Sequence, residues 1–187
     1  LLLSPVLPLI APASLVHAQV SRHLAAIIAY HDSQGNIWVV DEDGSNARQL
    51  TDKGRDCCAA WSPDGSRLYF LRFPRSDLDG RQAGGVVMAY DFATASEQQV
   101  GPNDLKAEAS GIAIAPDGAH LAFMHNFKQS NPQDLRSSYN CLAQLSVITG
   151  EYEDLQCGGP WASPSYSPDG SGIMATNGIL ESVAITI

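Results

Sequence analysis

Short runs rich in apolar, β-branched and aromatic residues follow one another along the chain, and clusters of polar turn residues separate them. Residues 67–73 form one such run, between a Ser-Pro-Asp-Gly segment at 62–65 and a polar stretch at 74–84. Short β-rich runs bounded by turn residues are typical of β-strands, and the 3.6-residue period of an amphipathic helix does not occur. The pattern therefore predicts an all-β chain of short strands.

The turn segment returns at a fixed interval. Ser-Pro-Asp-Gly occupies residues 62–65 and 167–170, and Ala-Pro-Asp-Gly occupies residues 115–118, so that the spacings are 53 and 52 residues. Proline presets φ for a tight turn, and the glycine tolerates a positive φ. A regular period of this length indicates a repeat architecture.

Each repeat contains four predicted strands, which we label a to d from the inside outward. Four antiparallel strands per repeat are typical of a β-propeller blade. Along the chain we expect strands b to d of one blade, two complete blades, and strands a to c of a fourth. Because closed propellers have at least four complete blades, this count predicts an incomplete arc of about three to four blades, truncated at both ends.

The first repeat carries a family resemblance. Residues 37–51, with the sequence IWVVDEDGSNARQLT, are followed by Trp-Ser-Pro-Asp-Gly at 61–65. This pattern resembles the WD40-like repeat of TolB-type β-propellers, over most of residues 27–176. The later copies are degenerate, since Ala115 replaces the serine and Tyr166 replaces the tryptophan.

The resemblance implies a periplasmic or secreted propeller that serves as a scaffold for interactions. It also leaves two alternatives open. Related propellers form the N-terminal part of prolyl oligopeptidase-like peptidases, whose catalytic domain would then lie beyond this sequence, and others act as lyases on pectic oligosaccharides.

The first 18 residues are apolar and interrupted by prolines, and they end in Val16-His17-Ala18. Val16 and Ala18 stand at positions −3 and −1 before Gln19, where such residues fit a signal-peptide cleavage site. We expect residues 1–18 to be a truncated signal peptide and residues 19–187 to be the propeller segment. The leader is too short and too proline-rich for a membrane span, and export would expose the four cysteines to an oxidising compartment.

The net charge is −9, from 20 acidic and 11 basic residues. A chain with so few cations is unsuited to nucleic acid, which requires basic groups that displace counterions. The sequence also lacks the Gly-x-Ser-x-Gly, Walker and His-Glu-x-x-His motifs. These observations favour a non-catalytic protein without cofactor or metal.

Alignment of the repeats on their turns places a polar residue near the end of strand b in all four blades. These residues are His31, Arg72, His125 and Asn177. Strand alternation predicts that they share one face and form a polar arc at the rim opposite the turns. The arc could be a site for a polar or anionic ligand, a metal site that uses His31 and His125, or a row of solvated strand ends.

The long b–c loops emerge at the same rim and add Arg75 and Tyr139 as contact candidates, since loops on rigid scaffolds carry function. We expect a protein partner or a small polar ligand there. Cys141 and Cys157 flank the hairpin turn at 149–150, which predicts a disulfide between them. Cys57 and Cys58 are open between a vicinal disulfide and two free thiols, and Trp61 is expected to pack between blades.

Overall fold

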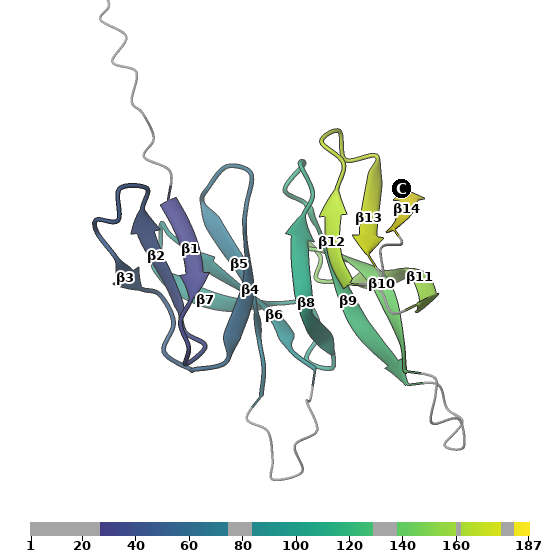
Figure 1. The fold of residues 1–187 in the computed structure, drawn as a ribbon, viewed down its shortest axis with the longest axis horizontal. Helices are drawn as coiled ribbons and strands as arrows, with labels where there is room; N and C mark the ends of the chain where they lie inside the picture. Colours follow the sequence, from purple (N-terminus) through teal and green to yellow (C-terminus); the bar gives the residue numbers. More distant parts are fainter. Residues whose placement is uncertain (1–26, 75–83, 129–137, 160–161, 177–181) are drawn as a thin grey trace, which may run out of the picture.

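The computed structural model of the chain describes residues 27–74, 84–128, 138–159, 162–176 and 182–187 (Figure 1). Within these ranges the chain contains fourteen strands, which form four antiparallel sheets in chain order. We call the sheets blades 1 to 4. All strand neighbours within a blade are consecutive in the sequence, so each blade is a simple meander.

The strands of each blade have the following bounds. Blade 1 comprises β1 (Ile27–His31), β2 (Ile37–Asp41) and β3 (Arg48–Gln49). Blade 2 comprises β4 (Asp56–Trp61), β5 (Arg67–Arg72), β6 (Val86–Asp91) and β7 (Ser96–Val100). Blade 3 comprises β8 (Ala107–Ile114), β9 (His120–Lys128), β10 (Ser138–Ser146) and β11 (Tyr152–Gly159). Blade 4 comprises β12 (Ala162–Tyr166), β13 (Gly172–Thr176) and β14 (Ser182–Thr186).

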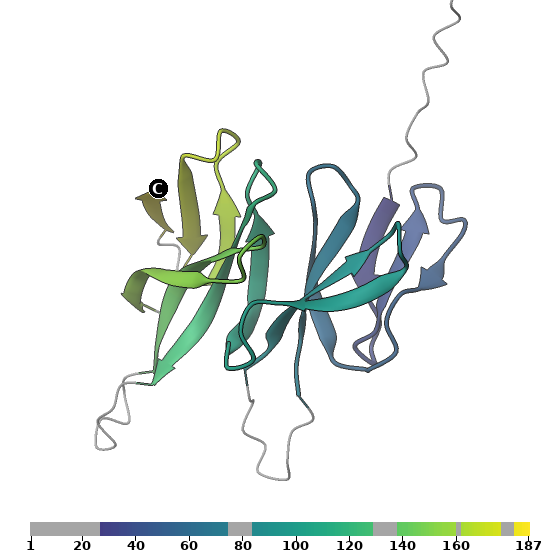
Figure 2. The same cartoon turned by 180° about the vertical axis from the view of Figure 1, so that it is seen from behind.

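The four blades stand side by side in an open arc, as the opposite views in Figures 1 and 2 show. Two central blades have four strands and the flanking blades have three described strands each. This arrangement confirms the predicted all-β class, the four-stranded antiparallel blade and the partial propeller. The β4–β5, β8–β9 and β12–β13 turns lie along the upper edge in Figure 1, and we call this edge the turn rim. The opposite edge, where strands a begin and strands b end, is the loop rim.

The repeated turns are stabilised by hydrogen bonds that recur from copy to copy. The glycine N–H donates to the carbonyl of the first turn residue at 2.9 Å in all three copies, and the glycines have φ values of +70°, +71° and +75°. In the first copy Asp64 accepts hydrogen bonds from the Ser62 hydroxyl at 2.6 Å and from the Ser66 N–H at 3.0 Å. Asp169 has equivalent partners in the third copy. These bonds, those from the serine hydroxyls first, lower the pKa of Asp64 and of Asp169 to about 2.

Three apolar clusters fill the interfaces between consecutive blades. The cluster between blades 1 and 2 is centred on Ile37, Leu68 and Phe70. A larger cluster of the same kind joins blade 2 to blade 3, and a further cluster joins blade 3 to blade 4. Burial of apolar surface between blades, rather than within a blade, therefore supplies most of the hydrophobic stabilisation.

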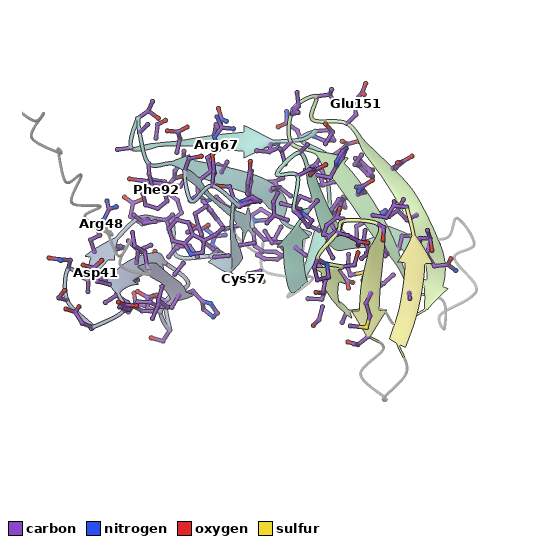
Figure 3. The ribbon with its side chains drawn as sticks, turned by 90° about the horizontal axis from the view of Figure 1, so that it is seen from above. Asp41, Arg48, Cys57, Arg67, Phe92 and Glu151 are labelled. Carbon is purple, nitrogen blue, oxygen red and sulfur yellow. A yellow bond between two sulfur atoms is a disulfide. The ribbon has the colours of Figure 1, made fainter. Side chains whose placement is uncertain are left out.

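Trp61 is partly buried and packs against the first of these clusters. Its ring stacks on Phe92 with a centroid distance of 5.1 Å. The Arg48 guanidinium lies over the Phe92 ring at 5.4 Å, and Figure 3 shows the two side chains next to each other. Trp61 thus contributes to packing between blades as expected, although it is not fully enclosed.

The innermost strand of each of blades 2, 3 and 4 contains a bulge that sequence reasoning missed. The ladder shifts register between Cys57 and Ala60 in β4, and β8 and β12 show equivalent shifts. One residue with positive φ lies in each bulge, four positions before the first turn residue. These residues are Cys58 at 61°, Gly111 at 106° and Ser163 at 52°. Only one of the three is a glycine, so composition gave no common signal.

All four cysteines lie in the described part of the chain, and all are paired. Cys141 and Cys157, the predicted pair, stand directly opposite each other in β10 and β11 and are joined. Cys57 and Cys58, whose state the sequence left open, are bonded to each other at the β4 bulge.

Candidate ligand-binding rim

Arg72 ends strand β5 at the loop rim and is bound to two carboxylates of its own blade. Its Nε and Nη2 donate to the two oxygens of Asp56, each at 2.7 Å, and its Nη1 donates to Glu97 at 2.6 Å. The Asp56 side chain is fully buried and the Arg72 side chain is 18% exposed. The hydrogen bonds that Arg72 donates to Asp56, and then the one to Glu97, raise the pKa of Arg72 despite its burial. Arg72 therefore links strands a, b and d of blade 2.

His125 occupies the same repeat position in blade 3 and has the same kind of partner. Its Nε2 lies 2.5 Å from an Asp154 oxygen on strand d, and its side chain is only 10% exposed. The imidazole also contacts the rings of Phe123 and Tyr152 at centroid distances of 5.9 and 5.8 Å. In both complete blades the polar residue of strand b is thus already bonded to a carboxylate of strand d.

Gln49 and Gln99 define how blade 1 aligns with blade 2. Each side-chain amide donates to the backbone carbonyl two residues further on, at 2.7 and 3.3 Å. This shared bond makes the two glutamines equivalent. Counting along the ladders from them places His31 level with Leu71, one position short of Arg72.

The prediction that His31 shares the face of Arg72 is therefore wrong. His31 stands opposite Ile37, on the face that packs against blade 2, and its side chain is exposed. Arg72 lies on the face of blade 2 that carries Phe70 and packs against blade 1. A shift of one residue moves a side chain to the other face of a sheet. Blade 1 offered no Ser-Pro-Asp-Gly turn as a reference for its alignment.

Asp32 takes the place in blade 1 that corresponds to Arg72. Its Oδ2 accepts a hydrogen bond from the Trp38 indole at 2.9 Å, and its Oδ1 accepts the N–H groups of Gln34 and Asn36 at 2.9 Å. These bonds, that from Asn36 first, lower the pKa of Asp32. Asp32 is therefore also used in the structure of its own blade.

Three further candidates of the loop rim lie wholly or partly outside the described residues. Asn177 and Arg75 lie outside the described residues, as does the side chain of Tyr139. The Tyr139 backbone belongs to β10 and stands opposite Phe127 of β9.

Among the described residues, one group brings together three side chains that could ligate a metal ion, and it consists of His125, Cys141 and Asp154. The thiol of Cys141 is committed to the disulfide with Cys157, which leaves a histidine and a carboxylate. His31 does not belong to this group. His31 and His125, the pair considered for a metal site, lie on blades 1 and 3, and blade 2 stands between these two blades.

A cavity of about 460 Å³ opens at the loop rim, and we call it the basic pocket. The connections β3–β4, β5–β6 and β7–β8 supply most of its lining. Four of its residues are basic: Lys53, Arg55, Arg72 and Lys106. Its apolar residues are Phe73, Pro74, Val86 and Leu105. Four of the eleven basic residues of a chain with a net charge of −9 thus gather around one cavity.

The four cations of the basic pocket differ in how far their charge is satisfied. Arg72 has two carboxylate partners, and Lys53 pairs with Asp52 at 2.8 Å on the exposed surface. Arg55 and Lys106 form no ion pair with another described residue. The Nη1 atom of Arg55 is buried and has no hydrogen-bond partner in the described structure. Buried polar groups are nearly always bonded, so this atom indicates a place for an acceptor.

The backbone around the basic pocket is fixed by short-range contacts. The Arg55 carbonyl accepts the Phe73 N–H at 3.0 Å, and Gly85 and Ala107 exchange two hydrogen bonds of 2.8 Å. A Cβ on Gly84 would lie 2.4 Å from the Cα of Lys106, so only glycine permits this approach. The cations therefore project from a frame that is largely formed before any ligand arrives.

Comparison with known proteins shows similar folds among solved structures. No family model and no curated protein matches the chain. Among solved structures, TolB from Acinetobacter baumannii superposes with a TM-score of 0.64 at 14% identity, over 86% of this chain and 39% of the other. The chain has a β-propeller fold like that of TolB.

Two further propeller structures agree with this assignment. A chain of the nidogen/laminin complex matches with a TM-score of 0.63 at 14% identity, over 86% of this chain and 55% of the other. An oligogalacturonate lyase in complex with manganese matches with a TM-score of 0.56 at 18% identity, over 84% and 44%. The TolB-like propeller segment thus spans between 39% and 55% of the length of these three relatives. At such identities the likeness establishes the fold alone.

Sequence reasoning missed the basic pocket of this TolB-like segment. Arg55 and Lys106 lie on separate connections between blades, and neither belongs to a repeated motif. The equivalence of the two d–a connections, each directly before a strand a, was the available signal. Both connections carry basic residues within three positions of that strand.

Proposed function

We propose that this chain is an exported, non-catalytic propeller module that binds a protein or a small ligand at its loop rim. The observation that carries the proposal is the basic pocket, where Arg55 and Lys106 have no carboxylate partner among the described residues. Concave sites with a few convergent polar groups in an apolar lining are the usual form of a binding site. The turn rim, by contrast, consists of three short and nearly identical turns.

A role in binding agrees with the complexes in which similar propellers occur. One of the similar propellers was solved as part of a nidogen/laminin complex, where it belongs to a protein–protein assembly. The propeller is also well suited to the task, because rigid blades can carry loops that vary without disturbing the core. None of the described segments is an apolar helix of membrane-spanning length.

Export is the second part of the proposal. Both disulfides support it, since such bonds persist in oxidising compartments and are rare in the cytosol. The apolar segment at 1–18 agrees with a leader that directs the chain to the periplasm or the medium. Mass spectrometry of non-reduced peptides from the native protein should find Cys141 linked to Cys157. Recovery of free thiols at both positions would contradict export.

Site-specific photo-crosslinking tests the binding face. A photoreactive amino acid is placed at Asn103 in the basic pocket, or at Asp117 on the turn rim, in the full-length protein within its native cells. Both positions are exposed, so the probe should not disturb the core. We expect defined crosslinked products from position 103 and none from position 117. Products from position 117 alone would move the binding face to the turn rim.

A further inference from the structure

We propose that the basic pocket binds a carboxylate group attached to an apolar body. A peptide that ends in an apolar residue and a small apolar carboxylic acid share this chemistry. The inference rests on the proposed function in taking the loop rim as the contact face, and it adds the chemical class of the ligand.

Arg55 supplies the anion-binding group. Its Nη1 is buried and has no hydrogen-bond partner among the described residues, and burial of an unbonded polar atom is costly. A guanidinium presents its donors in a planar fork that matches the two oxygens of a carboxylate. Lys106, whose ammonium forms no ion pair with the described residues, lines the same cavity and adds a second positive charge.

Arg72 shows the same chemistry in its satisfied form. In the lining of the same cavity its guanidinium holds the Asp56 carboxylate through two bonds of 2.7 Å. Arg55 precedes Asp56 in the sequence, but no carboxylate of the described chain occupies its fork. An incoming carboxylate would complete at Arg55 the arrangement that Asp56 completes at Arg72.

The other half of the lining determines what the carboxylate is attached to. Phe73, Val86 and Leu105 give the cavity an apolar side, on which Phe73 and Val86 are partly exposed. The volume of about 460 Å³ has room for more than an isolated anion. An apolar group beside the carboxylate would bury against these side chains, whereas inorganic phosphate or acetate would leave them in contact with water.

Titration calorimetry on the full-length protein tests the inference with four probes. Hydrocinnamate and hydrocinnamamide share the same apolar body and differ in a charged carboxylate against a neutral carboxamide. An acetylated Ala-Phe dipeptide is used in the same way, as the free acid and as the C-terminal amide. We expect saturable binding of at least one acid, with its amide roughly tenfold weaker or more, because hydrogen bonds to charged groups are the strong ones. Tighter binding of the dipeptide acid points to a peptide terminus, and comparable or tighter binding of hydrocinnamate points to a small acid.

Variants localise the binding. Arg55→Gln should weaken the acid roughly tenfold, whereas Arg67→Gln, which removes the same charge at the turn rim, should leave it unchanged. Lys106→Gln changes an exposed side chain, so that it keeps the fold and should weaken binding by about threefold. Acid and amide that bind equally, no saturable binding of either acid, or equal losses in Arg55→Gln and Arg67→Gln would each overturn the inference.

The two proposals can fail separately. Crosslinks from position 103 without any carboxylate binding would retain the binding module and refute only the ligand class. Carboxylate binding that depends on Arg55, without crosslinks from position 103, would retain the pocket and refute the proposed protein contact.

Discussion

Arg72 and Asp56 bind each other through both arms of the guanidinium, with Nε–Oδ1 and Nη2–Oδ2 distances of 2.7 Å. The bonds join the end of β5 to the start of β4 at the loop rim, and Glu97 adds a third bond from β7. A residue that the sequence offered as a ligand contact is thus a brace across its own blade. Arg55, which lines the same pocket, has no such carboxylate partner among the described residues.

Replacement of Arg72 should be strongly destabilising. Arg72→Met leaves the Asp56 carboxylate buried without its cation, which costs about 3–5 kcal/mol. Arg67→Met is the matched control, because the Arg67–Asp91 pair is more exposed and should contribute about 1 kcal/mol or less. The free energies of unfolding from urea titrations give both values. Equal losses in the two variants would show that Asp56 is accessible to water.

Substitutions at the bulge residues of the inner strands should change the stability of the fold in opposite directions, depending on whether a glycine is removed or introduced. Gly111→Ala puts a Cβ on a residue with φ of 106°, where the nearest atom would be an ordinary 3.8 Å away, so the cost of about 1–2 kcal/mol is a backbone cost. Ser163→Gly relieves a serine with φ of 52° and should stabilise the protein by up to about 1 kcal/mol.

Thermal unfolding of both variants beside the parent measures these shifts. If the unfolding temperatures of Gly111→Ala and Ser163→Gly moved in the same direction, the equivalence of the two bulges would be refuted.

Acid should remove the contribution of the turn aspartates. The pKa of Asp64 falls from 3.8 to about 2 on folding, because the Ser62 hydroxyl and the Ser66 N–H bond its charged form. A lowered pKa stabilises the folded state above the unfolded value of 3.8, and this stabilisation is lost as the pH falls through about 2. The urea midpoint of Asp64→Asn should therefore lie below that of the parent at neutral pH, and the gap should close on acidification. A gap that does not change with pH would contradict the hydrogen-bonded turn.

The two disulfides should differ in how much they stabilise the fold. Cys141 and Cys157 are separated by 16 positions, so their bond restricts the unfolded chain and should contribute about 3 kcal/mol. The bond between Cys57 and Cys58 joins neighbours and closes almost no loop. Urea unfolding of Cys141→Ala/Cys157→Ala and Cys57→Ala/Cys58→Ala should show the larger loss for the first pair. The reverse order would indicate that the vicinal bond shapes the folded state.

The sequence predicted those parts of the structure that are encoded locally and repeated. The turns at 62–65, 115–118 and 167–170 located the strands on either side of them. The period of these turns predicted the blades and which strands each blade contains. The hairpin between β10 and β11 likewise indicated which cysteines meet. Each of these features depends on residues that are close in the chain or spaced at the repeat length.

Features without a local, repeated signal in the sequence could not be predicted. His31 is one residue out of the predicted register, because blade 1 lacks the repeated turn and only its strand pairing, counted from Gln49, aligns it with blade 2. The bulges were missed because three different residue types adopt positive φ at the same position. Arg55 and Lys106 meet in one cavity only after two separate connections have packed at the same rim.

We propose the loop rim, through the basic pocket, as the binding face of this chain. Quantitative co-purification of the tagged full-length protein from its native cells tests it most directly, with Arg55→Gln/Lys106→Gln compared with Asp64→Asn/Asp117→Asn. Each pair changes two exposed or partly exposed charged residues on one rim. We expect proteins that are recovered with the parent to be lost from the first pair and retained by the second. Retention by the first pair and loss from the second would contradict it.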